Sequence, residues 1–177
     1  ITAYTNDRES PIDIHIGQGL SRGERMDYAV QKSTDLGVKS LTPLFTDRSE
    51  VKLTAERQEK RSAHWQQISI SASEQSFRAS PMSVNAPVSL TEWIDQCDAE
   101  LKLILHPHLE LTSLNSEPKP SSVALLIGPE GGLEESEVEL ALQKGFKPWL
   151  LGSRILRTET APVAAASVLN YLWGDFS

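Results

Sequence analysis

The sequence is short of cysteine and of long apolar runs. Its one cysteine, Cys97, excludes an internal disulfide and indicates a reducing compartment. No apolar run approaches the ~20 residues that a membrane-spanning helix needs. The start of the chain, ITAYTNDRESP, also lacks the apolar segment of a signal peptide. We therefore expect a cytoplasmic protein that does not cross a membrane.

An excess of positive charge is also absent. The formal net charge is -7, which by itself argues against a nucleic-acid partner. The charge is unevenly distributed, because residues 1–80 hold eleven Lys/Arg and eleven Asp/Glu, whereas residues 81–177 hold six and thirteen. A basic face on the first half is therefore compatible with the composition. The 177 residues, 39% of them apolar, are enough for one domain with a buried core.

Strand and helix patterns alternate along the chain. Helices are predicted at residues 25–36, 54–76, 91–97, 134–145 and 160–174, with a loop at 77–90. Strands are predicted at 11–16, 38–45, 101–107, 123–128 and 147–152. Continuous apolar strands predict a parallel sheet covered on both faces, so the fold class is α/β. The strand at 11–16 is left open, since it belongs either to this domain or to a preceding one.

A glycine-rich turn, GPEGG at 128–132, joins a predicted strand to a predicted helix. It contains neither of the glycine patterns that bind phosphate, and the nearby glutamates would repel one. A cationic cofactor without phosphate, such as S-adenosylmethionine (SAM), suits such a loop. The plain alternative is a tight connection to a helix whose first turns carry acidic residues, as helix N-termini favour.

A second glycine loop, LLGSRILRTETAP at 150–162, follows the next predicted strand. Arg154 and Arg157 lie three residues apart and flank an apolar pair. The loop is either anchored in the core or forms a pocket wall, with apolar side chains against a ring and arginine facing RNA.

These two loops together resemble the C-terminal motifs of the ribosomal small-subunit RNA uridine N3-methyltransferase family. GERMDYAVQKSTDLGVKSLTPLFTDRS and HWQQISISASEQSFR resemble earlier parts of that family, so the likeness covers roughly residues 16–173. The family belongs to the SPOUT class, which implies a C-terminal trefoil knot, bound SAM and a homodimer. It also implies a SPOUT domain at 16–177, with residues 1–15 the remnant of an N-terminal β-barrel (PUA-like) RNA-binding domain.

The resemblance places the cofactor in three loops. The implied SAM-binding residues are Leu105, His106, Pro107, Ile127, Gly128, Pro129, Glu130, Gly131, Gly132, Leu151, Gly152, Ile155, Leu156, Arg157 and Thr158. His106 and His108 have poor spacing for a metal and no third partner, so no metal is expected.

The implied reaction is methylation at N3 of a uridine in small-subunit (16S) ribosomal RNA. The nitrogen must lose its imide proton, and arginine suits the negative charge that develops. Matching motif positions suggests Arg78, Glu74 and Arg157 as catalytic residues. Spacing alone favours an i, i+4 surface ion pair between Glu74 and Arg78, and the resemblance is what favours the catalytic role, more for Arg78 than for Glu74. Phe77 stands where the family commonly has glycine, which affects the local shape beside Arg78.

RNA contacts are expected from the arginine-bearing first half. The candidates are Arg22, Arg25, Lys32, Arg48, Lys52 and Arg78. For Arg57, Lys60 and Arg61 a solvated helix surface is the better interpretation. Two other functions stay open: a non-catalytic RNA-binding or ribosome-assembly protein of the same fold, and a 2'-O-ribose RNA methyltransferase.

Overall fold

The structure, a computed structural model, describes residues 8–49, 51–109 and 113–177. Its centre is a seven-stranded sheet with the strand order β3-β2-β1-β6-β5-β7, in which β4 also pairs with β2. Every pairing is parallel, which confirms the predicted α/β class. The strands span β1 Asp13–Gly19, β2 Ser40–Phe45, β3 Ser83–Val84, β4 Val88–Ser89, β5 Leu101–Leu105, β6 Ser122–Ile127 and β7 Lys147–Trp149.

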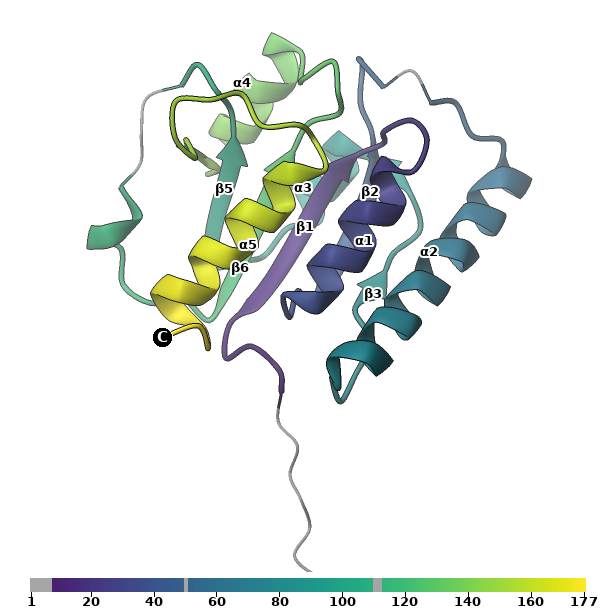
Figure 1. Cartoon of the computed structure of the whole chain (residues 1–177). Coiled ribbons are helices and arrows are strands. Elements are labelled where there is room, and N and C mark those ends of the chain that lie inside the picture. Colours follow the sequence, from purple (N-terminus) through teal and green to yellow (C-terminus); the bar gives the residue numbers. More distant parts are fainter. Residues whose placement is uncertain (1–7, 50, 110–112) are drawn as a thin grey trace, which may run out of the picture.

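Helices cover both faces of this sheet, with α1, α2 and α5 on one face and α3 and α4 on the other (Figure 1). They agree closely with the predicted ranges. The helices span α1 Arg25–Asp35, α2 Ala55–Ser76, α3 Leu90–Gln96, α4 Glu135–Gln143 and α5 Thr160–Trp173, with a 3-10 turn η1 at Leu114–Ser116. Two of them begin with a hydroxyl cap, because the side chains of Thr54 and Ser89 accept the amides of Arg57 and Glu92.

The core lies on both sides of the sheet because successive side chains of a strand alternate between its faces. In β6, Val123, Leu125 and Ile127 pack with the cluster under α1, α2 and α5. Ala124 and Leu126 pack with the cluster under α3 and α4. Burial on both faces explains why the strands appear in the sequence as continuous apolar runs.

The first strand corrects the sequence analysis. β1 lies between β2 and β6 in the middle of the sheet, so it belongs to this domain and not to a preceding one. Ile12, Ile14 and Ile16 are each 1% exposed or less. A domain boundary at residue 15 would cut this strand.

Two other segments differ from prediction. The strand expected at 147–152 is only three residues long, because the chain leaves the sheet after Trp149 and its next residues, Leu150 and Leu151, line a pocket. The segment expected to be a loop, 77–90, contributes the two-residue strands β3 and β4 at the sheet edge.

Phe77 ends α2 with a φ of 59°, in the left-handed region that favours glycine. An ordinary side chain costs about 1–2 kcal/mol in this conformation. The ring is 66% exposed, and the guanidinium of Arg8 lies 5.4 Å from its centroid. The departure from glycine noted in the sequence therefore falls where the backbone most favours glycine.

We expect Phe77→Gly to be more stable than Phe77→Ala by about 1 kcal/mol. Both variants lose the contact between the ring and Arg8, but only glycine relieves the left-handed strain. Urea unfolding with comparable m-values measures the difference. Equal stability of the two variants would show that the backbone there carries no strain.

Within the described residues, no helix is long and apolar enough to cross a bilayer.

Candidate active site

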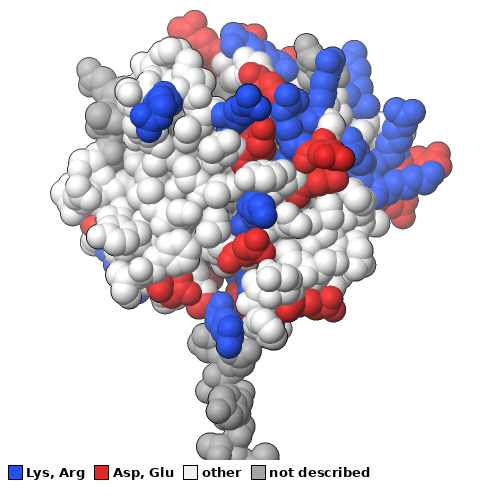
Figure 2. All heavy atoms as spheres, viewed as in Figure 1, with Lys and Arg blue, Asp and Glu red and all other residues white. Residues whose placement is uncertain are grey.

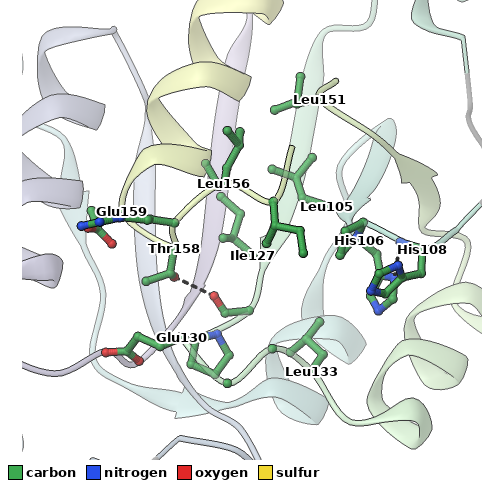
Figure 3. Close-up of a pocket in the computed structure, with 18 of the residues that line it drawn as sticks. Leu105, His106, His108, Ile127, Glu130, Leu133, Leu151, Leu156, Thr158 and Glu159 are labelled. Atoms are coloured by element: carbon green, nitrogen blue, oxygen red, sulfur yellow. Dashed lines mark hydrogen bonds between the residues drawn. The ribbon is translucent and has the colours of Figure 1, made fainter. Parts of the chain in front are cut away.

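A cavity of about 680 Å³ opens at the carboxyl ends of β5, β6 and β7. Three segments form its walls: residues 105–108 after β5, 127–133 after β6, and parts of 149–161 after β7. Ligands of parallel sheets bind at this edge, and the volume is typical of a small-molecule site. Leu105, Ile127 and Leu156 lie together in the middle of the close-up (Figure 3).

The predicted cofactor residues meet in this cavity, with one exception. Gly152 does not line it, whereas its neighbours Leu151, Ile155 and Leu156 do. Gly152 has a φ of 75°, so its role is to turn the backbone after β7. The remaining predicted residues on its walls are Leu105, His106, Pro107, Ile127, Gly128, Pro129, Glu130, Gly131, Gly132, Arg157 and Thr158.

Other lining residues were not predicted from the sequence. They are His108, Leu133, Trp149, Leu150, Arg154, Glu159 and Ala161. Most directly follow or precede a predicted member, so their adjacency in the loops was the available signal. Arg25 and Arg48, predicted as RNA contacts, also line the cavity and approach it from the other half of the chain.

The loop after β6 lies directly against the end of β1. A Cβ placed on Gly19 would be 2.5 Å from both Cδ and N of Pro129. Only glycine allows this approach, because real Cβ contacts do not fall below 3.0 Å. Gly19 therefore sets where the wall at residues 128–132 lies.

A buried hydrogen-bond chain joins the same strand to the other wall. Gln18 Nε2 donates to Thr158 Oγ1 at 2.7 Å. Thr158 Oγ1 in turn donates to the carbonyl of Gly128 at 2.7 Å (Figure 3). Gln18 is 1% exposed. The end of β1 thus holds the loops after β6 and β7 in a fixed relation.

Glu130, the acidic residue within the glycine turn, is held by α1 and the residues before it. Its Oε1 accepts the backbone amide of Arg22 at 2.8 Å and Arg25 Nη1 at 2.8 Å. Burial favours the neutral acid, but these hydrogen bonds and the charge of Arg25 outweigh it, and the pKa of Glu130 is below its ordinary value. The negative charge that appeared out of place in the turn is therefore locally balanced.

Arg48 holds the same loop from the β2–α2 connection. It donates to Glu134 Oε1 at 2.8 Å and to the carbonyl of Gly131 at 3.1 Å. The hydrogen bond from Arg48 is the first cause that lowers the pKa of Glu134. Glu137 is 8% exposed and accepts the amides of Glu134 and Asp47. The acidic residues at the start of α4 therefore cap that helix and also fasten the pocket wall. The helix capping that the sequence offered as the plain alternative is thus part of what these residues do.

The charge on Glu130 predicts how the stability of the protein depends on pH. Its pKa is lower in the folded protein, so its stabilisation is present above the unfolded-state value of about 4.3 and is lost as the pH falls through the folded value. We expect Glu130→Gln to destabilise the protein by about 1 kcal/mol or less at pH 7. Denaturant unfolding across pH measures this difference, which should shrink steadily below pH ~4.3. A difference that grows on acidification would contradict the assignment.

His106 and His108 stack edge to face at the far side of the cavity from Glu130 and Glu159 (Figure 3). Burial, and then the charge of His108, lowers the pKa of His106, so it is neutral near pH 7. Neutral imidazole suits contact with a cofactor. No group of three or more His, Cys, Asp or Glu side chains is placed to hold a metal in the described part of the chain.

Arg78 corrects the sequence analysis. Its side chain is 4% exposed, pairs with Glu9 at 2.6 Å, and donates to the carbonyls of Thr34 and Val38. It does not line the cavity. Burial of Glu9 opposes ionisation, but Arg78 lowers the pKa of Glu9 overall. A guanidinium enclosed in this way fastens α1 and the chain before β1, and it lies outside the cavity.

The other two predicted catalytic residues differ from one another. Glu74 is exposed on α2 and does not line the cavity. The alternative was an i, i+4 ion pair between Glu74 and Arg78, but Arg78 pairs with Glu9. The structure therefore does not bring Glu74 to the pocket. Arg157 is exposed and does line the cavity.

The remaining predicted RNA contacts lie outside the pocket. Lys and Arg side chains gather around the N-terminal ends of α1 and α2 (Figure 2). Arg22 and Lys52 are exposed, while Lys32 is half-buried with its ammonium 5.7 Å from the Tyr28 ring centroid. Lys60 pairs with Glu56, in keeping with the solvated helix surface expected there.

Comparison with known proteins identifies the class of this fold and pocket. Residues 8–170 match the family model described as an RNA methyltransferase domain. Ribosomal RNA small subunit methyltransferase E of Buchnera aphidicola from Schizaphis graminum is 39% identical over 96% of this chain and 69% of its own. The same-named protein of Bacillus subtilis is 34% identical over 97% of this chain and 71% of its own. The chain belongs to this ribosomal RNA small subunit methyltransferase E family.

Solved structures agree. A methyltransferase structure from Legionella pneumophila, with bound SAM, has a TM-score of 0.92 and 44% identity, covering 96% of this chain and 70% of the other. Ribosomal RNA small subunit methyltransferase E from Neisseria gonorrhoeae, bound to SAM, has a TM-score of 0.90 and 42% identity, covering 98% and 71%. The chain thus spans about 70% of the length of these structures.

Proposed function

We propose that this protein transfers the methyl group of SAM to N3 of one uridine in small-subunit ribosomal RNA. It is a SAM-dependent ribosomal RNA methyltransferase, as the names of its relatives and the SAM in the two solved structures support. The observation that carries the proposal is the meeting of the three motif-bearing loops around one cavity at the carboxyl edge of the sheet.

The pocket suits SAM chemically. Leu105, Ile127 and Leu156 provide an apolar surface for the adenine ring, and the glycines at 128, 131 and 132 expose backbone groups to its edge. The lining carboxylates Glu130 and Glu159 suit a ligand with a positive sulfur more than one with phosphate. Bound SAM supplies an electrophilic methyl group.

The chain's own work is to position the uridine and manage its proton and charge. Removal of the imide proton spreads negative charge over the flanking carbonyl oxygens. Arg157, exposed and on the pocket wall, is our candidate for stabilising that charge. The candidates for contact with RNA phosphates are Arg22, Lys32 and Lys52. Two further candidates, Arg25 and Arg48, also hold the pocket loop after β6.

The course of the chain after β7 supports the trefoil knot that the resemblance implies. β7 pairs with β5 at the sheet edge, whereas α5 packs against α1 and β6. The segment 150–159 therefore crosses the carboxyl ends of β5 and β6, where Thr158 bonds to Gly128. A crossing of this kind is what a knot at the pocket requires, and such threading is rare in other folds.

An uncharged surface over α5 supports a homodimer. The sequence of α5, TAPVAAASVLNYLW, holds no charged residue, and the surface over this helix is free of Lys, Arg, Asp and Glu in Figure 2. Tyr171 is 65% exposed and Phe176 52% exposed. An apolar helix face of this kind is typical of an interface between subunits.

The proposal extends to the rest of the protein. The SPOUT domain begins before Ile12 in this proposal, because β1 lies in the middle of its sheet, and residues 1–7 of the expected N-terminal remnant (1–15) lie outside the described residues. The ribosomal RNA substrate fits the cytoplasmic location expected from the single cysteine.

Methyl transfer from labelled SAM to small ribosomal subunits from a strain lacking the gene tests this function. Digestion to nucleosides and mass spectrometry should place the label in 3-methyluridine. Label on a ribose would instead identify a 2'-O-methyltransferase. A dimer that neither binds SAM in calorimetry nor transfers label would be the non-catalytic RNA-binding alternative.

A further inference from the structure

Among the described residues, two glutamates line the pocket, and their carboxylates have different partners. Glu130 Oε1 is occupied by the Arg22 amide and by Arg25 Nη1. Glu159 Oε2 is buried and makes no hydrogen bond. Arg25 Nε lies 3.7 Å from it, which is an ionic contact too long for a hydrogen bond. Glu159, a residue of the pocket wall, therefore has one buried carboxylate oxygen without a hydrogen-bond donor.

The position of Glu159 in the chain does not explain this oxygen. Glu159 is the residue before α5, where a side chain commonly accepts an amide of the first helical turn. Here the side chain makes no such bond. Its charge still favours the helix N-terminus, by about 0.3–1 kcal/mol. That electrostatic benefit does not require a desolvated oxygen, and a buried acceptor without a donor is costly.

Glu159 also lies on the charged side of the cavity. In Figure 3 it follows Thr158 on the same side as Glu130, while His106 and His108 lie on the opposite side. Leu105, Ile127 and Leu156 separate the two sides. A ligand whose ring occupies the apolar middle leaves the side with Glu159 for the polar edge of a substrate base.

We propose that Glu159 is the catalytic residue that accepts the imide proton of the target uridine. This inference rests on the proposed function, and it assigns the role first sought at Glu74. The N3–H bond breaks and its proton passes to the Glu159 carboxylate. The electron pair left on N3 forms the bond to the methyl carbon as the carbon–sulfur bond breaks, and that pair remains on sulfur. S-adenosylhomocysteine and 3-methyluridine result, and the carboxyl later releases its proton to water.

The charged groups that face Glu159 come from three places. Arg25 on α1 is the cation in contact with it, Glu130 comes from the loop after β6, and Arg157 from its own loop. Arg25 places a positive charge beside the Glu159 carboxylate. The imidazoles of His106 and His108 lie across the pocket. The test therefore compares the pH dependence of kcat in the wild type with that in a Glu159 variant, because the wild-type profile alone does not identify the group involved.

The test compares Glu159→Gln with wild type in SAM calorimetry and in the methylation of small ribosomal subunits across pH. We expect an unchanged SAM dissociation constant and a kcat at least about 100-fold lower, the smaller end of what a positioned base contributes. The limb of the kcat profile that rises with pH should disappear in Glu159→Gln. Glu159→Asp, which keeps a carboxylate, should retain that limb at a reduced rate.

Glu135→Gln is the matched control, because Glu135 is an exposed carboxylate on α4 outside the pocket. It should methylate as wild type does. A Glu159→Gln rate close to that of wild type would overturn the proposal, as would a rate loss fully explained by weaker SAM binding. Transfer by wild type and Glu159→Gln alike overturns only the role of Glu159. Absence of transfer by the wild-type protein overturns the proposed function and this role together.

Discussion

Replacing Gly19 with alanine should weaken SAM binding at least about tenfold. The new Cβ would lie 2.5 Å from Cδ and N of Pro129, which are part of a pocket wall and cannot rotate away. The wall at residues 128–132 must therefore shift, and with it the Gly128 carbonyl that accepts Thr158 Oγ1. Overpacking costs roughly 1–3 kcal/mol, and each 1.4 kcal/mol is tenfold in affinity. Calorimetric titration with SAM measures the change.

Gly17→Ala provides a control on the same strand. Its Cβ would meet the side chain of Trp93 at 2.8 Å, on the sheet face under α3 and away from the cavity. This variant should lose stability but keep wild-type SAM affinity. Equal loss of SAM affinity in both variants would show that general destabilisation, and not the position of the loop, controls binding.

Replacing Arg78 with methionine should lower the free energy of unfolding by about 2–4 kcal/mol. The substitution removes the cationic partner of Glu9 and the side-chain donor to the carbonyls of Thr34 and Val38. The folded variant should keep wild-type SAM affinity and kcat, because Arg78 does not line the pocket. Urea unfolding and methylation rates on the same preparation measure both quantities.

A double-mutant cycle with Glu9→Gln separates this structural role from a catalytic one. The two substitutions should be coupled by about 1–3 kcal/mol in stability, as expected for residues in direct contact. A stable Arg78→Met protein with a much reduced kcat would instead restore Arg78 to the catalytic residues.

The walls of the candidate pocket could be predicted because their motifs are local in sequence. Each wall is a short loop after an apolar strand, and its glycines are visible in the printed chain. The wall at 150–162 was ambiguous alone, yet all but Gly152 of the predicted cofactor residues meet in one cavity. The misplaced appearance of Glu130 had a physical solution that the sequence hides, because Arg25 is more than a hundred residues away.

The errors share a cause, which is contact between residues distant in sequence. Arg78 resembled a catalytic arginine because its partner Glu9 is 69 residues away. β1 was difficult to assign because His15, Gly17 and Gln18 interrupt its apolar pattern. Each of these three has a use: His15 bonds to Ser40, Gly17 admits Trp93, and Gln18 reaches Thr158. A central strand need not be apolar throughout where its polar residues find buried partners.

Mass spectrometry of small-subunit ribosomal RNA from a strain lacking the gene tests the central claim most directly. Loss of one 3-methyluridine, restored by the wild-type gene but not by the gene encoding Gly19→Ala, is the predicted result. Ribosomal RNA that keeps all its 3-methyluridine and instead loses a 2'-O-methyl group, or loses nothing, would contradict the account.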